Sequence, residues 1–195
     1  MTLQHVFTRP TASGVAFSYA RVAPDMINER DLVHHMSRRE CWGGNTDFSS
    51  YSVAQHALVT MSACRLPEAR VYALLSAAPA AYLGWMDPAL KLWLAEGGND
   101  IIGLEHRIFT AVLEHFDVTR PSAEIYADVH QAEQRAQATE WRDVVRGRID
   151  RWAPSGKPLA AVIRFKPQPK IEDELAAALE RELRPFRERT AERSK

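Results

Sequence analysis

Histidine is the residue type in this sequence with the widest choice of chemistry, because imidazole can bind a metal, relay a proton or fill a core. Seven are present. His34 and His35 are adjacent, and neighbouring residues of a helix point about 100° apart, so the two do not serve one site easily. His56 differs, since it lies beside the apolar stripe of a predicted helix. The others on predicted helices stand alone among charged neighbours, which favours ordinary surface positions: His106, His115 and His130.

The cysteines and the charge balance limit the classes of partner. Cys41 and Cys64 are too few for a disulfide framework or a cysteine-rich zinc site, which indicates small buried residues in a reducing, cytoplasmic setting. Because 25 Lys and Arg residues balance 25 Asp and Glu residues, bulk attraction to nucleic acid is not expected. No apolar run approaches the ~20 residues that cross a bilayer. We therefore expect a cytoplasmic protein without a membrane or nucleic-acid partner.

Helices must position these side chains, because nearly every long segment places apolar residues three or four positions apart. Ser52 is the expected N-cap of a helix that carries His56 and runs to about Cys64. Residues 68–83 are rich in Ala and Leu, which predicts a central helix that Pro79 bends near its last turn. The remaining predicted helices cover residues 29–40, 88–94, 101–116, 121–145 and 171–187.

The 195 residues suit a single domain, which we predict to be all-α. Residues 1–28 should form an irregular or short extended start, and residues 29–145 the helical core. Residues 146–170 are rich in Pro and basic residues, which predicts a surface linker with one short extended piece from Ala161 to Phe165. Residues 171–195 should form an amphipathic helix with a frayed tail, whose apolar line could also dock on a second subunit.

A set of short motifs follows in order along the predicted helical core. They are Tyr51-Ser52-Val53-Ala54-Gln55-His56, Ala73-Leu74-Leu75, Ala81-Tyr82-Leu83-Gly84, Leu90-Lys91 and Ala138-Thr139-Glu140. In this order and spacing the chain resembles the HD-domain phosphohydrolases, and especially their small single-domain branch that includes bacterial 5'-deoxynucleotidases. The resemblance covers most of the chain and implies a single HD-domain helical bundle. Small members of that family are often dimers, so it also implies a homodimer.

The resemblance assigns roles to particular positions. In the family, one His, an adjacent His-Asp pair and a later Asp bind a divalent metal that activates water for attack on a phosphoryl group. The first His corresponds to His56 and the last Asp to Glu133. The other functional positions hold residues of different chemistry: Ser76 and Ala77 at the His-Asp pair, Ala80 at a carboxylate that assists the water, Trp85 at a further Asp, and Cys41 at an Arg before Trp42.

These replacements imply that the hydrolytic site has been lost. His56 and Glu133 supply two metal ligands, whereas catalytic zinc sites usually retain three. We therefore expect no catalytic residue, no metal and no other cofactor. The alternative is a divalent transition metal held by His56, Glu133 and a recruited ligand such as Asp87 or His35. Asp87 precedes Pro88, however, which is typical of a helix N-cap.

The sequence thus leads to one main hypothesis and two alternatives. The main hypothesis is a catalytically inactive HD-fold protein that acts as a binding or regulatory module, with a nucleotide or another small phosphorylated molecule as its ligand. The first alternative is a divergent metal-dependent nucleotide phosphohydrolase, and the second is a structural protein whose old pocket has collapsed around Trp85. Lys91 is either a retained anion contact or the solvated end of a short helix. The expected pocket residues are Trp42, His56, Ser76, Tyr82, Trp85 and Lys91.

Overall fold

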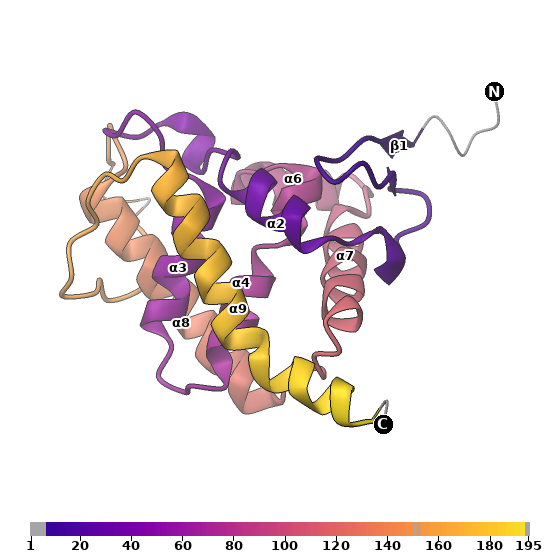
Figure 1. Ribbon diagram of the computed structural model, residues 1–195. Coiled ribbons are helices and arrows are strands. Elements are labelled where there is room, and N and C mark those ends of the chain that lie inside the picture. Colours follow the sequence, from indigo (N-terminus) through magenta and orange to yellow (C-terminus); the bar gives the residue numbers. More distant parts are fainter. Residues whose placement is uncertain (1–6, 150, 152, 194–195) are drawn as a thin grey trace.

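The computed structural model describes residues 7–149, 151 and 153–193. Its fold is all-α, as predicted. The helices are α2 (Glu29–Met36), α3 (Val53–Ala63), α4 (Ala69–Ser76), α5 (Pro79–Leu83), α6 (Pro88–Glu96), α7 (Ile101–His115), α8 (Ala123–Asp143) and α9 (Gln168–Arg193) (Figure 1). Short 3-10 turns cover Pro24–Met26 and Trp42–Gly44. Near the N-terminus, β1 (Thr8–Arg9) pairs antiparallel with β2 (Phe17–Ser18). None of the helices in these residues has the length and apolar character that a membrane span requires.

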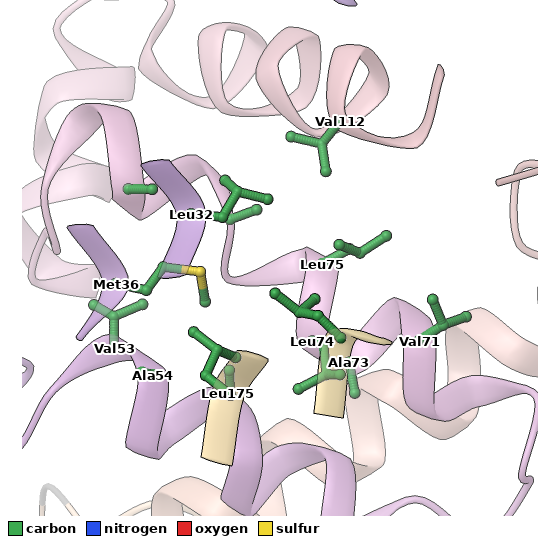
Figure 2. Close-up of a cluster of buried hydrophobic side chains, with 14 of the residues drawn as sticks. Leu32, Met36, Val53, Ala54, Val71, Ala73, Leu74, Leu75, Val112 and Leu175 are labelled. Atoms are coloured by element: carbon green, nitrogen blue, oxygen red, sulfur yellow. The ribbon is translucent and has the colours of Figure 1, made fainter. Parts of the chain in front are cut away.

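The core forms where α3 and α4 pack together, with α8 on one side and α9 crossing them (Figure 1). Figure 2 shows how side chains from separate helices meet there: Leu32 and Met36 of α2, Val53 and Ala54 of α3, Val71, Ala73, Leu74 and Leu75 of α4, Val112 of α7 and Leu175 of α9. All of them are buried. Burial of apolar surface is the main favourable term in folding, so this cluster fixes the helices that carry the candidate site.

The start of α3 confirms the predicted N-cap. The hydroxyl of Ser52 accepts a hydrogen bond from the backbone N–H of Gln55 (3.4 Å), and the Gln55 side chain accepts one from the backbone N–H of Ser52 (3.1 Å). Such a reciprocal capping box satisfies two donors that a helix start leaves free. It defines the beginning of α3 and thereby the position of His56 one turn later.

The predicted single helix over residues 68–83 is wrong. The chain instead forms α4 and α5, separated at Ala77 and Ala78. Proline inside a helix lacks the N–H donor and clashes with the carbonyl one turn earlier. The chain avoids this clash by starting a new helix with Pro79 as its first residue, and Ala78 N–H bonds back to the carbonyl of Leu75 (3.0 Å). The break leaves Ser76 at the C-terminal end of α4.

The C-terminal helix is longer than predicted and its apolar line is covered by the chain itself. Ile171, Leu175, Leu179 and Leu183 are each at most 2 % exposed, and α9 packs against α2, α3 and α4. The suggestion that this line docks on a second subunit is therefore wrong, because these side chains already complete the core of one chain.

The predicted extended piece from Ala161 to Phe165 does not form a strand in the described residues. Side chains at the end of α8 hold this part of the chain instead. Arg142 donates hydrogen bonds to the carbonyls of Leu159 (2.8 Å) and Ala161 (2.9 Å), and Asp143 accepts one from the backbone N–H of Ile163 (2.8 Å). The rest of the predicted linker lies on the surface where it is described.

Candidate functional site

A cavity of about 560 Å³ lies between α7 and α8. From α8, Tyr126, Val129, Glu133 and Gln137 line it, and their spacing of three or four residues places them on one face of the helix. The facing side of α7 contributes residues at the same spacing: Ile102, Glu105, His106, Phe109, Thr110 and Leu113. The cavity therefore runs along two helices rather than around a single point.

The floor of the cavity is α4. Both α7 and α8 pack on α4 but make few contacts with each other, and they diverge from their connection at residues 116–122 (Figure 1). Tyr72 of α4 donates a hydrogen bond to the carbonyl of Thr119 in that connection (2.9 Å). One end of the cavity thus lies where α7 and α8 meet, beside Arg120. Ser76, one turn after Tyr72, lies toward the other end.

His56 lines that other end together with Glu133. Its Nδ1 lies 2.8 Å from Oε1 of Glu140, a carboxylate that is 1 % exposed. The Tyr51 hydroxyl donates to the same oxygen and the Trp42 indole N–H donates to Oε2, both at 2.9 Å. Nε2 of His56 makes no hydrogen bond with any residue that the structure describes. Glu140 therefore fixes the ring and leaves its second nitrogen for a ligand.

The buried carboxylate controls the protonation of its neighbours. Burial lowers the pKa of His56, but the charge of Glu140 and the hydrogen bond that its carboxylate accepts from the ring, with a smaller contribution from Glu133, outweigh burial and raise the pKa above the usual 6.5. Burial, assisted by the charge of Glu140, raises the pKa of the Tyr51 hydroxyl and of the Cys41 thiol well above their usual values. The protonated form of the imidazole is thus favoured beside Glu140, whereas the Tyr51 hydroxyl and the Cys41 thiol are held in their neutral forms.

Trp42 reaches Glu140 from an unusual backbone conformation. Its φ is 55°, in the left-handed region that bulky residues rarely occupy, and Gly43 and Gly44 continue the turn with φ of 60° and 75°. The Trp42 ring also lies 6.3 Å from the Trp85 ring, measured between centroids. Strained residues persist where surrounding contacts fix them, and here these contacts are the bond to Glu140 and the packing against Trp85.

The positions that the resemblance singles out largely meet at this cavity. His56, Ser76, Trp85 and Lys91, all expected at the pocket, line it. So do the replaced positions Ala77 and Ala80, as well as Glu133. Lys91 is not the solvated helix end that was one of its two alternatives, because its ammonium group lies 2.8 Å from the carboxylate of Glu105 and both side chains are partly buried. The Ser76 hydroxyl bonds to the carbonyl of Ala73 (3.1 Å).

Two expected pocket residues lie elsewhere. Tyr82 is fully buried, and its ring stacks on Phe17 of β2 at a centroid distance of 4.2 Å. Its carbonyl accepts hydrogen bonds from Arg9 (2.7 Å) and from the Tyr19 hydroxyl (2.9 Å), so Tyr82 anchors the N-terminal hairpin. Trp42 lies behind the cavity wall and acts on the cavity through Glu140 and Trp85.

The residues of the cavity do not fit a metal ion held by three protein ligands. His56 and Glu133 are both present, but the proposed recruited ligands are absent from the lining. Asp87 caps α6, accepting a hydrogen bond from Ala89 N–H (2.8 Å), and His35 is half-buried outside the lining, with its Nε2 atom buried. Within residues 7–149, 151 and 153–193, no three His, Cys, Asp or Glu side chains are grouped so that they could hold a metal.

Glu140 is the functional candidate that the sequence reasoning did not single out. It follows Glu133 by two helical turns and therefore lies near the same face of α8. Its buried neighbours along that helix are small, namely Ala132, Ala136 and Thr139. An acidic residue among small buried residues is a signal for a paired carboxylate, because an isolated buried charge is very costly.

Comparison with known proteins adds no assignment. No family model matches the chain, and no curated protein matches it either.

Proposed function

We propose that this chain is a catalytically inactive HD-like domain that binds a nucleotide or another small phosphorylated molecule in the cavity between α7 and α8. The proposal rests on one observation, which is that the positions with an assigned catalytic role meet at a single cavity. His56, Ser76, Ala77, Trp85 and Glu133 occupy the positions that the resemblance assigns to catalysis, and all of them line one cavity of about 560 Å³. Small-molecule sites commonly measure roughly 300–1,000 Å³.

The lining of the cavity supports a ligand that is partly aromatic and partly anionic. Trp85, Phe109 and Tyr126 provide aromatic surface, on which a nucleobase can stack. Lys91 and Arg120 add cationic groups, one of which is already paired. The open volume also argues against the collapsed pocket, since Trp85 forms part of the wall and leaves the cavity accessible.

The chemistry of the replaced positions supports the loss of hydrolysis. Methyl groups at Ala77 and Ala80 cannot bind a metal or accept a proton. The Ser76 hydroxyl is engaged with a carbonyl of its own helix. Two candidate ligands, His56 and Glu133, fall short of the three that catalytic zinc sites usually retain, so the alternative of a divergent metal-dependent hydrolase has less support.

Binding is tested by calorimetric titration with adenosine 5'-monophosphate and by thermal shift, since a ligand of the folded state must raise Tm. We expect saturable binding that Trp85→Ala weakens by about 10-fold, the effect of losing one stacking contact. Trp93→Ala is the matched control, because Trp93 is 68 % exposed and lies outside the cavity lining. Flat responses with all nucleotides would contradict the proposal and favour a purely structural protein.

Loss of activity is tested by metal analysis after incubation with manganese, cobalt or zinc, and by phosphatase assays with deoxynucleoside monophosphates and triphosphates. We expect well below one ion per chain and no turnover. One bound metal ion per chain together with turnover, both abolished in His56→Ala, would instead establish the divergent hydrolase.

A further inference from the structure

The two ends of the cavity differ in charge. The geometry points to a ligand whose phosphate lies at the end away from His56, opposite to the orientation in the hydrolases that the chain resembles. A nucleoside monophosphate with an amino group on its base would lie with its phosphate at Arg120 and its amino group at Glu133, at the end of the cavity that His56 lines. This inference rests on the proposed function and deepens it. In the hydrolases that the chain resembles, the phosphate must instead meet the metal, at the end marked by His56.

Arg120 supplies the positive end. It lines the cavity at the connection between α7 and α8, and its guanidinium group has no hydrogen bond or ion pair with any residue in the described part of the chain. The neighbouring Thr119 is fixed by the Tyr72 hydroxyl at 2.9 Å, which holds the backbone beside Arg120. A guanidinium group suits bidentate binding of phosphate. Lys91 is a weaker candidate, because Glu105 neutralises it at 2.8 Å.

Glu133 supplies the negative end. It lines the cavity beside His56 and makes no hydrogen bond or ion pair within the residues that the structure describes. His56 pairs with the buried carboxylate of Glu140 at 2.8 Å, which leaves Glu133 as the second carboxylate at this end, without a partner among the described residues. A phosphate placed here would face two carboxylates and be repelled. An exocyclic amino group would donate to Glu133 instead.

The spacing of the two ends requires an elongated ligand. Glu133 lies about 15 Å along the axis of α8 from the first residue of that helix, given a rise of about 1.5 Å per residue, and Arg120 precedes that first residue. A free phosphate ion therefore cannot reach both groups. Between them the walls include Phe109, Leu113 and Val129, whose apolar surface suits a base and the carbon face of a sugar.

The test is isothermal titration of the full chain with adenosine 5'-monophosphate, adenosine and inosine 5'-monophosphate, in which a carbonyl replaces the amino group. We expect Arg120→Gln to weaken binding of adenosine 5'-monophosphate by at least about 10-fold and to leave adenosine binding unchanged. Glu133→Gln should abolish the preference for adenosine 5'-monophosphate over inosine 5'-monophosphate. Arg184→Gln and Glu188→Gln are matched controls, since both residues are exposed on α9.

The outcomes separate this inference from the function on which it rests. If the wild-type chain binds none of the three compounds, the proposed function fails and the orientation fails with it. If it binds adenosine 5'-monophosphate but Arg120→Gln keeps the wild-type preference over adenosine, only the orientation is overturned. The same conclusion follows if His56→Ala, rather than Arg120→Gln, removes that preference. Thermal melts of each variant confirm that the chain is folded.

Discussion

Glu140 determines the chemistry of the residues around it. Its carboxylate is 1 % exposed and accepts hydrogen bonds from Trp42, Tyr51 and His56. A buried charge is stable only when it is paired and hydrogen-bonded. Of these three partners, only the imidazole can carry a positive charge, so the electrostatic balance of the cluster depends on His56.

Replacement of the carboxylate should therefore be costly. We expect Glu140→Gln to lower the free energy of unfolding by about 2–4 kcal/mol, because the amide group places a donor opposite other donors and removes the charge that pairs with His56. Denaturant unfolding followed by circular dichroism measures this. Glu188→Gln, on the exposed side of α9, should change stability by no more than about 0.5 kcal/mol. Similar losses in both variants would contradict the assigned role.

The same pair predicts how stability depends on pH. The pKa of His56 is raised in the folded chain above its usual 6.5, so the stabilisation from its protonated form is complete below pH 6.5 and is lost as the pH rises through the folded pKa. His56→Asn keeps a donor near the position of Nδ1 but does not titrate. The stability difference between wild type and His56→Asn should shrink over that window. A difference that stays constant with pH would refute this assignment, and NMR titration of the ring gives the pKa directly.

Among the elements, the sequence predicted best what depends on adjacent residues. The N-cap of α3 needs only Ser52, and the cap of α6 needs only Asp87 followed by Pro88, so both caps were predicted, whereas the return bond from Gln55 was not. The break between α4 and α5 also has a local cause in Pro79, but its extent depends on what the two parts pack against. α5 lies on α2 and α7, contacts that the local pattern does not contain.

In the candidate site, too, some residues could be predicted from the sequence and others could not. The resemblance brought His56, Ser76, Trp85 and Glu133 to one cavity, since it carries information about distant pairs. It placed Tyr82 there too, but Tyr82 is held by Phe17 and the N-terminal hairpin, a segment outside the matching motifs. Glu140 stands in one of the motifs, but its role could not be predicted from the motif, because its partners Trp42 and Tyr51 come from a distant loop.

The cap of α6 should stabilise a helix that contributes Pro88 and Lys91 to the cavity lining. The helix has no buried residue, so few tertiary contacts support it and Asp87 matters more than an average cap. We expect Asp87→Ala to cost about 1 kcal/mol, which makes amide hydrogen exchange in α6 roughly 5-fold faster. Asp100→Ala is the matched control, since Asp100 is the N-cap of α7 but makes no side-chain cap bond. Unchanged exchange in α6 would show that its packing suffices.

At the scale of the whole molecule, α9 joins the parts together. It contacts α2, α3 and α4, and Arg38, just after the end of α2, reaches Glu172 of α9 at 3.1 Å. α9 thus covers the helices that carry His56 and Ser76. A single cooperative unit follows from this arrangement, since loss of α9 exposes the shared core.

Truncation of one buried side chain of α9 tests whether the chain unfolds as a single cooperative unit. Leu183 is 0 % exposed, so we expect Leu183→Ala to lower the free energy of unfolding by about 2–5 kcal/mol, with a single transition. Leu92→Ala removes the same atoms from a side chain that is 58 % exposed and should change stability by no more than about 0.5 kcal/mol. A second transition in Leu183→Ala would show that α9 unfolds separately.

The tryptophans behind the cavity also give the molecule an optical property. The rings of Trp85, Trp42 and Trp141 form a chain with centroid distances of 6.3 Å and 6.1 Å, close enough for excitation to pass from one indole to the next. Only Trp85 of the three lines the cavity, so light absorbed by any of them can be emitted or quenched at the wall that a ligand touches. Occupancy of the cavity should therefore be visible in the native fluorescence spectrum, without any attached dye.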